Sequence, residues 1–440
     1  MKISQASFDR FAWVGDSIKF YYSWDDKVTF THRLQIPGLT DTLSPTDVPG
    51  WQSAAFTAGL ARFPYYFAPL LPDKIIVKAG KLNSSQLKFW QNWYTNGLAE
   101  FLYKNRLPLK INLTSSSRRT YPPSTVPLQN TAFLLQGGGK DSAVAGEILS
   151  QSQVTPFTWL TLGMNRTRRL MIAASPVKDY VSLKGRADRT RNKLRRTLPV
   201  YRGHQPLSLY LAAAGSLTTL LSGKKYLIAA NEKSANFPNL TYRGQKINHQ
   251  YTKSFSFETE FAAYVKAYLH PKLEYFSLLR PLYELQITKI FSHLPQYHSH
   301  FVSCNTGIHT ASWCGRCSKC AFIFLSLYPF MAKAQLLKLF GANLLADPNL
   351  LDKYLKLAGV KNHKPFECVG TTEESQVALY LASQKPRPPQ TIKYFIDHFP
   401  QVFSRGQRFA PQILQNYDAA NLIPRSWQKA IKTQTLKLLT

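Results

Sequence analysis

Three glycines followed by a lysine, an aspartate and a serine form the segment of this chain best suited to chemistry. The segment consists of Gly137, Gly138, Gly139, Lys140, Asp141 and Ser142. The apolar run before it predicts a short buried strand, and a helix is expected from Ser142 onward. Glycines let the backbone approach a ligand closely, and the free N–H groups at a helix start bind anions. Because Lys140 adds a positive charge and Ser142 a hydroxyl donor, the segment predicts a phosphate-binding loop.

The spacing within this segment differs from that of the Walker phosphate loop, in which four residues separate the first glycine from Gly-Lys-Ser/Thr. It resembles the Ser-Gly-Gly-x-Asp-Ser loop of the ATP pyrophosphatase (PP-loop) superfamily, with Gly137 in place of the first serine. Enzymes with that loop cleave ATP to AMP and pyrophosphate, usually by adenylating a carboxylate or a carbonyl oxygen. The simpler alternative is an ordinary glycine turn between a strand and a helix.

Four cysteines lie close together in the sequence and suit a metal site. Cys314, Cys317 and Cys320 form a double C-x-x-C, Cys304 lies upstream, and Gly315 permits a tight turn between two ligands. Four thiolates favour a closed tetrahedral zinc site, whose role is structural because no coordination position is open. The alternatives are an iron–sulfur cluster, for which the typical spacings differ, and unliganded buried thiols.

Length and composition describe a folded protein of 440 residues, long enough for two or three domains. No apolar run reaches the ~20 residues of a membrane-spanning helix, and the N-terminus lacks the apolar core of a signal peptide. Crowded cysteines suit a metal site in a reducing compartment better than a disulfide framework. We therefore expect a cytoplasmic protein without a membrane partner.

The chain is strongly basic, with 55 Lys and Arg residues against 24 Asp and Glu residues and a formal net charge of +31. Such a charge attracts nucleic acids, membranes and anionic small molecules alike. The densest basic segment is 186–202, but other positive residues are spread along the chain. We do not expect a nucleic-acid partner from this pattern, although the charge does not rule one out.

Changes in composition divide the chain into regions. Residues 1–112 mix strand-like alternation with helical spacing, which predicts a small α+β domain. The polar, proline-bearing stretch 113–129 predicts a linker. Residues 130–370 predict a catalytic domain that contains the cysteine knuckle at 304–320, and residues 371–440 predict a helical, basic tail.

Short strands and helices alternate along the predicted catalytic domain. We expect strands at 133–136, 157–162, 170–174 and 226–230, and helices from 142 and over 207–221. This alternation predicts an α/β fold in which a parallel sheet has helices on both faces. Ligands of such sheets bind at the carboxyl ends of the strands, where the glycine loop, Asn231 and Glu232 are expected.

Taken together, the distinctive segments resemble the ATP-dependent UDP-N-acetylmuramoyl-L-alanyl-L-glutamate epimerase family of bacterial peptidoglycan synthesis. The matching segments lie at 96–101, 137–142, 231–235, 248–254, 257–258, 275–282, 284–285, 303–305, 313–320 and 363–370. The resemblance implies inversion of the terminal L-glutamate of the muramoyl dipeptide to D-glutamate. ATP is the second substrate, magnesium is the cofactor, and AMP and pyrophosphate are released. It also implies a PP-loop (adenine-nucleotide alpha-hydrolase-like) fold.

The resemblance implies roles for the residues of the glycine loop and its neighbours. Gly137–Ser142 should hold the pyrophosphate end of ATP, with Asn231 and Glu232 also in the nucleotide site. Asp141 should help to hold magnesium. Lys140 should stabilise the charge that develops on the leaving pyrophosphate.

Basic and titratable residues within the matching segments are candidates for substrate binding and proton transfer. For the acidic substrate the candidates are Lys253, Arg280 and Lys364, and for proton transfer they are His249, Glu258, Cys368 and His363. Lys253 is also a candidate catalytic residue. The alternatives are surface ion pairs for the basic residues and, for Cys368, a small buried apolar side chain.

Adenylation gives the implied epimerisation a physical reason. A Cα–H beside a carboxylate is very weakly acidic, because deprotonation would place two negative charges on one small unit, and adenylation removes the first charge. The α-proton could leave the linear acyl-adenylate or an oxazolone formed by attack of the alanyl carbonyl oxygen. Two other functions remain open: a PP-loop enzyme that modifies a nucleobase or tRNA, and a zinc-stabilised binding protein without catalysis.

Overall fold

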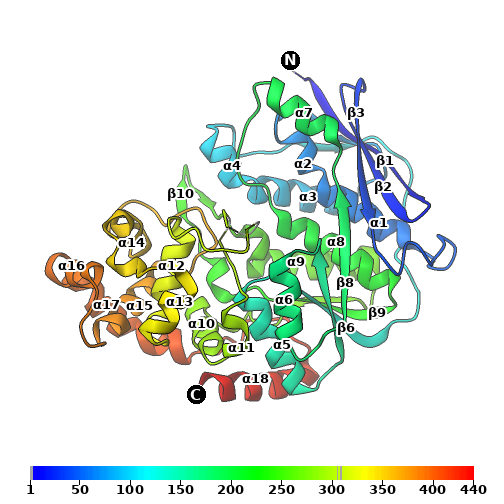
Figure 1. The fold of residues 1–440 in the computed structure, drawn as a ribbon. Helices are drawn as coiled ribbons and strands as arrows, with labels where there is room; N and C mark the ends of the chain where they lie inside the picture. The colour runs from blue at the N-terminus through cyan, green and yellow to red at the C-terminus, as the bar shows by residue number, and fades with distance from the viewer. Residues whose placement is uncertain (1–2, 305, 308–309) are drawn as a thin grey trace.

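The computed structural model describes residues 3–304, 306–307 and 310–440 (Figure 1). The predicted cysteine knuckle includes 305 and 308–309, which lie outside the described residues. The strands are β1 (Gln5–Val14), β2 (Ser17–Trp24), β3 (Val28–Gln35), β4 (Lys74–Val77), β5 (Leu113–Ser115), β6 (Gln129–Leu135), β7 (Phe157–Leu162), β8 (Tyr180–Arg186), β9 (Lys224–Ala229), β10 (Leu240–Tyr242), β11 (Gln245–Ile247) and β12 (Glu274–Ser277).

The centre of the molecule is a ten-stranded sheet in the order β12-β9-β6-β7-β8-β3-β2-β1-β4-β5, and β10 and β11 form a separate hairpin. The first five strands in that order pair in parallel. Strand β8 then pairs antiparallel with β3, where Leu34 lies opposite Gly185. The sheet is therefore mostly parallel, and it runs without interruption from the N-terminal region into the predicted catalytic region.

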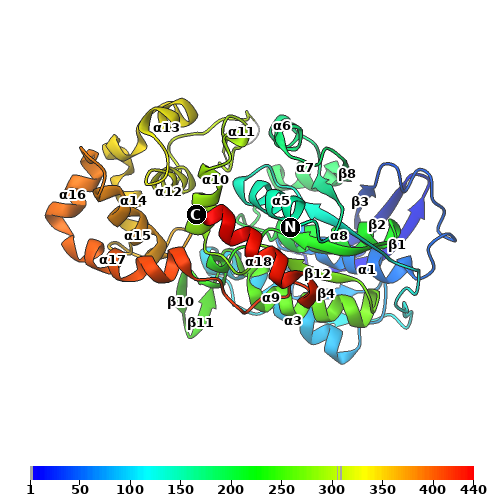
Figure 2. The ribbon, with the colours of Figure 1, turned by 90° about the horizontal axis from the view of Figure 1, so that it is seen from below.

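Helices cover both faces of the sheet (Figure 2). The helices up to residue 269 are α1 (Trp51–Arg62), α2 (Pro64–Phe67), α3 (Ser84–Gly97), α4 (Ala99–Lys104), α5 (Lys140–Ser152), α6 (Arg166–Ala174), α7 (Arg189–Thr197), α8 (Leu207–Leu221), η1 (Lys233–Asn236), η2 (Tyr251–Lys253), α9 (Phe255–Tyr264) and η3 (Val265–Leu269). Side chains of β6 alternate between two cores: Leu134 packs with helix α5, and Phe133 packs in the core that contains α8. A parallel sheet with helices on both faces was the predicted arrangement, and it is confirmed.

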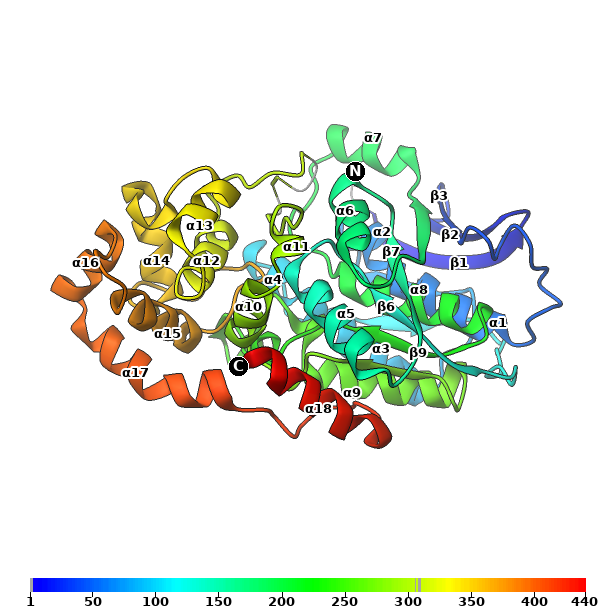
Figure 3. The ribbon, with the colours of Figure 1, turned by 60° about the horizontal axis from the view of Figure 1, so that its bottom comes forward.

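The C-terminal third of the chain is helical. Its helices are α10 (Glu284–Ser292), α11 (Pro295–His298), α12 (Ser318–Leu327), α13 (Lys333–Phe340), η4 (Leu344–Ala346), η5 (Pro348–Leu350), α14 (Leu351–Leu357), α15 (Thr372–Ser383), α16 (Gln390–His398), α17 (Pro400–Gln415) and α18 (Arg425–Leu439). Figure 3 places α12–α17 at one end of the molecule and strands β1–β3 at the other. The last helix, α18, returns to pack against α5 and α10. Within the described ranges, no helix has the length and hydrophobicity that a membrane crossing requires.

One predicted strand is wrong. Residues 170–174 belong to helix α6, which begins after Asn165, whose side chain accepts a hydrogen bond from Arg168 N. Met171 and Ile172 are buried in the core, whereas the preceding arginines remain accessible. Five consecutive apolar residues do not distinguish a strand from a helix by periodicity, and the capping asparagine decides the matter here.

Close packing of α5 against β7 generates the first prediction. A Cβ on Gly146 would lie 2.4 Å from Trp159 Cη2, and the buried indole is anchored by hydrogen bonds to Ser175 Oγ and Val177 O. We expect Gly146→Ala to lower the free energy of unfolding by about 1–3 kcal/mol, because overpacking exceeds the gain in helix propensity. Urea unfolding measures the effect. The control is Gly137→Ala, whose Cβ would meet no atom within 4 Å; equal stability of the two variants would contradict the prediction.

Candidate active site

The glycine loop lies between the end of β6 and the start of α5, at the carboxyl end of the parallel strands. Gly138 has a φ of 90°, a conformation that favours glycine. The side chain of Gln136 holds the turn: its Oε1 accepts from Gly138 N at 2.6 Å and from Ser142 Oγ at 2.5 Å. Ser142 therefore contributes to the shape of the loop, and Gln136 is a site residue that sequence reasoning missed.

A cavity of about 260 Å³ opens at this loop. Its lining includes Gly137, Gly139, Asp141, Ser142, Ser208, Asn231, Lys253, Tyr275, Ser303 and Lys319. The structure thus brings the loop and Asn231 together at one cavity, and it adds Lys253, a candidate for substrate binding, to the same lining. Lys319, between two cysteines of the knuckle, adds a second cation that the sequence analysis did not include among the site residues.

Three carboxylates form an acidic cluster beside the cavity. One oxygen each of Asp141, Glu232 and Glu284 lies within 4.8 Å of the others. Lys140 Nζ bridges this cluster, at 2.5 Å from Asp141 Oδ1 and 2.9 Å from Glu284 Oε1. Burial raises the pKa of Glu284 to about 8 despite the charge of Lys140. The oxygen donors suit a hard divalent cation such as magnesium. Glu284 was missed as a ligand, although it lies in one of the matching segments.

A second cluster lies on the other side of Lys253. Lys253 Nζ is 3.6 Å from Cys368 Sγ. Burial disfavours the thiolate, but the charges of Lys253 and Lys319 and a hydrogen bond with His249 outweigh burial and lower the pKa of Cys368 to about 5. The alternative of Cys368 as an inert apolar side chain does not match these surroundings. The thiol is half-buried, and its cationic neighbours favour the thiolate.

Two histidines in this cluster have pKa values that are shifted in opposite directions. His249 Nδ1 contacts Glu100 Oε2. Burial opposes the imidazolium, but Cys368 and Glu100 raise the pKa of His249 to about 9. The ring of His204 lies 4.2 Å from that of His249, and burial together with the charge of His249 lowers its pKa to about 4. One imidazole can therefore donate a proton while its neighbour accepts one.

Glu100 and His204 were not among the predicted site residues. Glu100 lies within the matching segment 96–101, which could have identified it. His204 lies in none of the matching segments, and only its position beside His249 reveals it.

A larger cavity of about 840 Å³ adjoins the second cluster. Its lining consists of Tyr103, Lys104, Arg106, Leu107, Pro108, Leu109, Lys110, Tyr242, Arg243 and Gln245. Lys104 joins the cavity to the cluster, since its Nζ donates to Glu100 Oε1 at 2.5 Å. Four cations and two tyrosines suit an anionic ligand that carries an aromatic ring.

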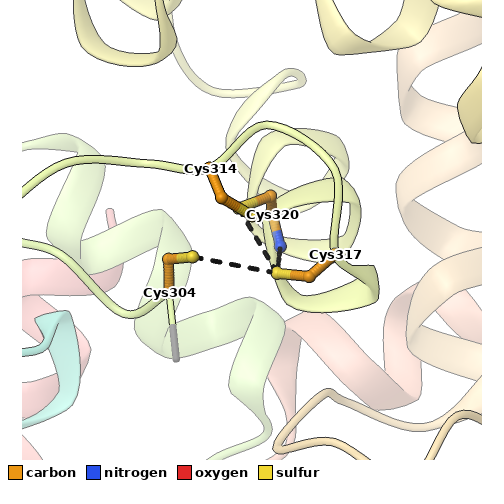
Figure 4. Close-up of side chains that lie close together, drawn as sticks. All are labelled: Cys304, Cys314, Cys317 and Cys320. Carbon is orange, nitrogen blue, oxygen red and sulfur yellow. Dashed lines mark hydrogen bonds between the residues drawn. The ribbon is translucent and has the colours of Figure 1, made fainter. Parts of the chain in front are cut away.

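The four predicted cysteines come together in the structure (Figure 4). Their sulfurs are 3.6 Å apart for Cys314 and Cys320, 3.5 Å for Cys317 and Cys320, and 4.0 Å for Cys304 and Cys317. A tetrahedral zinc site with Zn–S bonds of about 2.3 Å places its sulfurs about 3.8 Å apart. The donor set and its spacing therefore fit such an ion.

The cysteine cluster is tied to the segment that carries Cys368. Lys319 N donates to Glu367 Oε2 at 2.9 Å. The side chain of Lys319 lines the glycine-loop cavity, while Glu367 is the neighbour of Cys368 in the chain. Order in the cysteine knuckle thus positions groups in both clusters.

Glu258 and Arg280 form a buried ion pair away from solvent. Arg280 Nε donates to Glu258 Oε2 at 2.9 Å, and its other nitrogens donate to Glu232 O and Lys253 O at 2.6 Å. Both side chains are almost fully buried. We therefore assign this pair a positioning role in place of the carboxylate-binding and proton-transfer roles expected from the sequence.

The two remaining candidates lie at the edge of the site. Lys364 is buried, donates to Phe237 O at 3.2 Å, and has its pKa lowered by burial. His363 is exposed, and its ring lies 5.2 Å from that of Phe366. Neither lines the glycine-loop cavity.

The buried pair generates the second prediction. We expect Glu258→Gln to lower the free energy of unfolding by about 3–5 kcal/mol, because it leaves the Arg280 charge buried without a counter-ion. Thermal and urea unfolding measure the loss. The matched control is Lys361→Ala, which removes an exposed ion pair with Asp352 and should cost less than about 1 kcal/mol. Similar stabilities for the two variants would show that the buried Arg280 does not depend on the charge of Glu258.

Comparisons with known proteins agree on one family. The model of the MurL N-terminal domain matches residues 1–278, and that of the MurL C-terminal domain matches residues 300–405. Three relatives carry the name UDP-N-acetyl-alpha-D-muramoyl-L-alanyl-L-glutamate epimerase. The protein of Xanthomonas oryzae pv. oryzae is 30% identical over 93% of this chain and 92% of its own. Those of Salinispora tropica and a Micromonospora species are 34% and 31% identical over 77% of this chain and 75% and 76% of their own. The chain therefore belongs to the MurL family.

Proposed function

We propose that this protein inverts the terminal L-glutamate of UDP-N-acetylmuramoyl-L-alanyl-L-glutamate to D-glutamate, as an epimerase of bacterial peptidoglycan synthesis. The named relatives support this activity over most of the chain. The observation that carries the chemistry is the position of Lys253, which lies between a cavity suited to a nucleotide and a cluster of proton-transferring groups. Activation of the carboxyl group and inversion of the adjacent α-carbon can occur at that junction.

ATP and magnesium are assigned to the glycine-loop cavity. The backbone of the loop and the start of α5 bind the pyrophosphate end of ATP. Asp141, Glu232 and Glu284 supply oxygen ligands for magnesium. Lys140, held between two of these carboxylates, balances charge on the departing pyrophosphate. The reaction transfers AMP to the α-carboxyl of the glutamyl residue, which removes the negative charge that opposes loss of the α-proton.

The rest of the substrate is assigned to the larger, basic cavity. Lys104, Arg106, Lys110 and Arg243 offer four positive charges to the diphosphate, and Tyr103 and Tyr242 offer rings to the uracil base. Because Lys104 also contacts Glu100, a substrate held in this cavity presents its peptide end to the histidines. Inversion then requires that one histidine removes the α-proton and that the other histidine donates a proton.

Zinc is assigned to the four cysteines as a structural ion. Four protein sulfurs leave no open position for a reacting group. The ion would hold Lys319 at the cavity and Glu367 beside Cys368. We place this protein in the cytoplasm, where the precursor nucleotide is made and where thiols stay reduced.

The net charge of +31 favours a second candidate, a PP-loop enzyme that modifies RNA. An assay of AMP release separates the two functions, because AMP release by an RNA-modifying enzyme would depend on RNA in place of the muramoyl dipeptide.

The third prediction concerns Asp141. We expect Asp141→Asn to lower the release of AMP and pyrophosphate by at least about 100-fold, because a metal-binding carboxylate becomes a neutral amide of the same shape. The assay contains ATP, magnesium and the L,L-dipeptide nucleotide, and it measures AMP together with D-glutamate after acid hydrolysis. Lys361→Ala, which removes an exposed ion pair and does not touch the lining of the cavity, should behave as wild type. An unchanged rate of pyrophosphate release in Asp141→Asn would refute the assignment.

The fourth prediction concerns the metal. Purified protein should hold one equivalent of zinc, and Cys317→Ser should lose most of it. Its free energy of unfolding should fall by more than about 2 kcal/mol, because metal binding contributes directly to folding. Elemental analysis and thermal unfolding measure both effects, with Cys368→Ser as the control that keeps the metal. Less than half an equivalent in the wild-type protein would contradict the prediction.

A further inference from the structure

Three side chains from distant parts of the chain lie in the order of a nucleophile, a base and a carboxylate. The nearby imidazole of His249 favours the thiolate of Cys368. His249 Nδ1 in turn contacts Glu100 Oε2, and Glu100 is buried. A cysteine whose neighbouring imidazole is oriented by a carboxylate is arranged for attack on an acyl carbon.

Residues close to the thiol line the two cavities. Lys253 lines the glycine-loop cavity, and its Nζ is 3.6 Å from Cys368 Sγ. On the other side, Lys104 lines the basic cavity, contacts Glu100, and lies 4.8 Å from the centre of the Phe366 ring, two residues before Cys368. A substrate that extends from the basic cavity to the glycine loop therefore passes the residues that surround the sulfur.

We propose that Cys368 is the acyl acceptor of this enzyme, so that the glutamyl residue is inverted as a thioester of the protein. The proposal rests on the proposed function, because the reaction begins with the glutamyl carboxyl activated by AMP. The thiolate electron pair forms a bond to the carbonyl carbon, and the bond from that carbon to the phosphate oxygen breaks. AMP leaves with that electron pair as a phosphate monoester dianion, so the step requires neither a proton nor a redox partner.

A thioester makes the α-proton removable. Its carbonyl carries no charge, and sulfur donates π electrons to the carbonyl less than oxygen does, so the enolate that follows proton loss is stabilised. Covalent attachment also keeps the substrate in place while the proton leaves one face of Cα and another returns to the opposite face. Activation and inversion thereby become separate steps, each with its own group of residues.

The two histidines supply the proton transfers that the reaction still needs. Their rings lie 4.2 Å apart, and their pKa values are shifted in opposite directions, so His204 can accept the α-proton while His249 donates one. Once it has donated its proton to Cα, His249 is a neutral imidazole, and His204 passes the α-proton to solvent. His249 then accepts a proton from water as that water attacks the carbonyl carbon. The carbon–sulfur bond breaks, the thiolate recovers the electron pair, and the D-glutamyl acid gives its remaining proton to solvent and leaves as the carboxylate.

The test compares Cys368→Ala with the wild-type enzyme in three assays, each with ATP, magnesium and UDP-N-acetylmuramoyl-L-alanyl-L-glutamate. Exchange of labelled pyrophosphate into ATP reports adenylation, AMP release reports transfer of the acyl group, and D-glutamate reports inversion. We expect exchange within about threefold of wild type, whereas AMP release and D-glutamate fall by at least about 100-fold, because the adenylate lacks its acceptor. Cys368→Ser, which differs by one atom, serves in the same assays if the alanine variant does not fold.

Two results would overturn the proposal. AMP release at the wild-type rate from Cys368→Ala would mean that water or the alanyl carbonyl accepts the acyl group, with Cys368 at most a base at Cα. Loss of exchange together with AMP release would mean that the thiol serves adenylation. If the wild-type enzyme shows no pyrophosphate exchange when the muramoyl dipeptide is added, the proposed function itself is refuted. The failure of the thioester and the failure of the proposed function are therefore distinguishable.

A covalent adduct gives an independent readout. His249→Asn should slow hydrolysis of the thioester more than its formation, because Lys253 and Lys319 still favour the thiolate. After an acid quench, the peptide that contains Cys368 should then carry the mass of the substrate less one water, and neutral hydroxylamine should remove it. Absence of this mass from both the wild-type enzyme and His249→Asn at saturating substrate would overturn the thioester.

Discussion

A single buried guanidinium holds together the parts on which the candidate active site depends. Arg280 donates to Glu258 and to the backbone carbonyls of Glu232 and Lys253, which belong to two separate segments of the chain. The acidic cluster and the cation beside Cys368 are thereby fixed relative to each other. A planar group with five donors and a permanent charge suits this task, and the buried carboxylate of Glu258 makes its own burial possible.

The reactive groups of the site owe their charges to one another. Burial disfavours every charged form, so each persists only because a partner of opposite sign lies beside it. Lys140 stands between Asp141 and Glu284, and Lys253 faces Cys368. The charge of +31 reflects a chain rich in cations, and several of them stand where the proposed substrates bring phosphates and carboxylates. Electrostatic complementarity therefore links the composition of the chain to the geometry of its cavities.

The helical C-terminal region is part of the site as well as of the fold. Lys319 and Glu367 connect the cysteine cluster to the Cys368 segment. The carboxylate of Glu374 accepts hydrogen bonds from Thr371 N at 2.7 Å and, across the molecule, from Leu285 N at 2.9 Å, next to the acidic cluster. The site is therefore built from a parallel sheet that presents a nucleotide loop and from a helical layer that brings the thiol.

The sequence by itself predicted the features that depend on residues close together in the chain. The tertiary structure decided which distant residues pair and which charges their side chains carry. The glycine loop, the four cysteines and strands such as β7 depend on residues close together in the chain, so their patterns predicted them. The apolar run 170–174 failed as a strand because a cap outside it determines helix α6. Glu100 lies 149 residues from His249, and Lys253 lies 115 residues from Cys368. Such contacts, and the exclusion of water that shifts the pKa of each group, exist only once the sheet and its helical layers have packed.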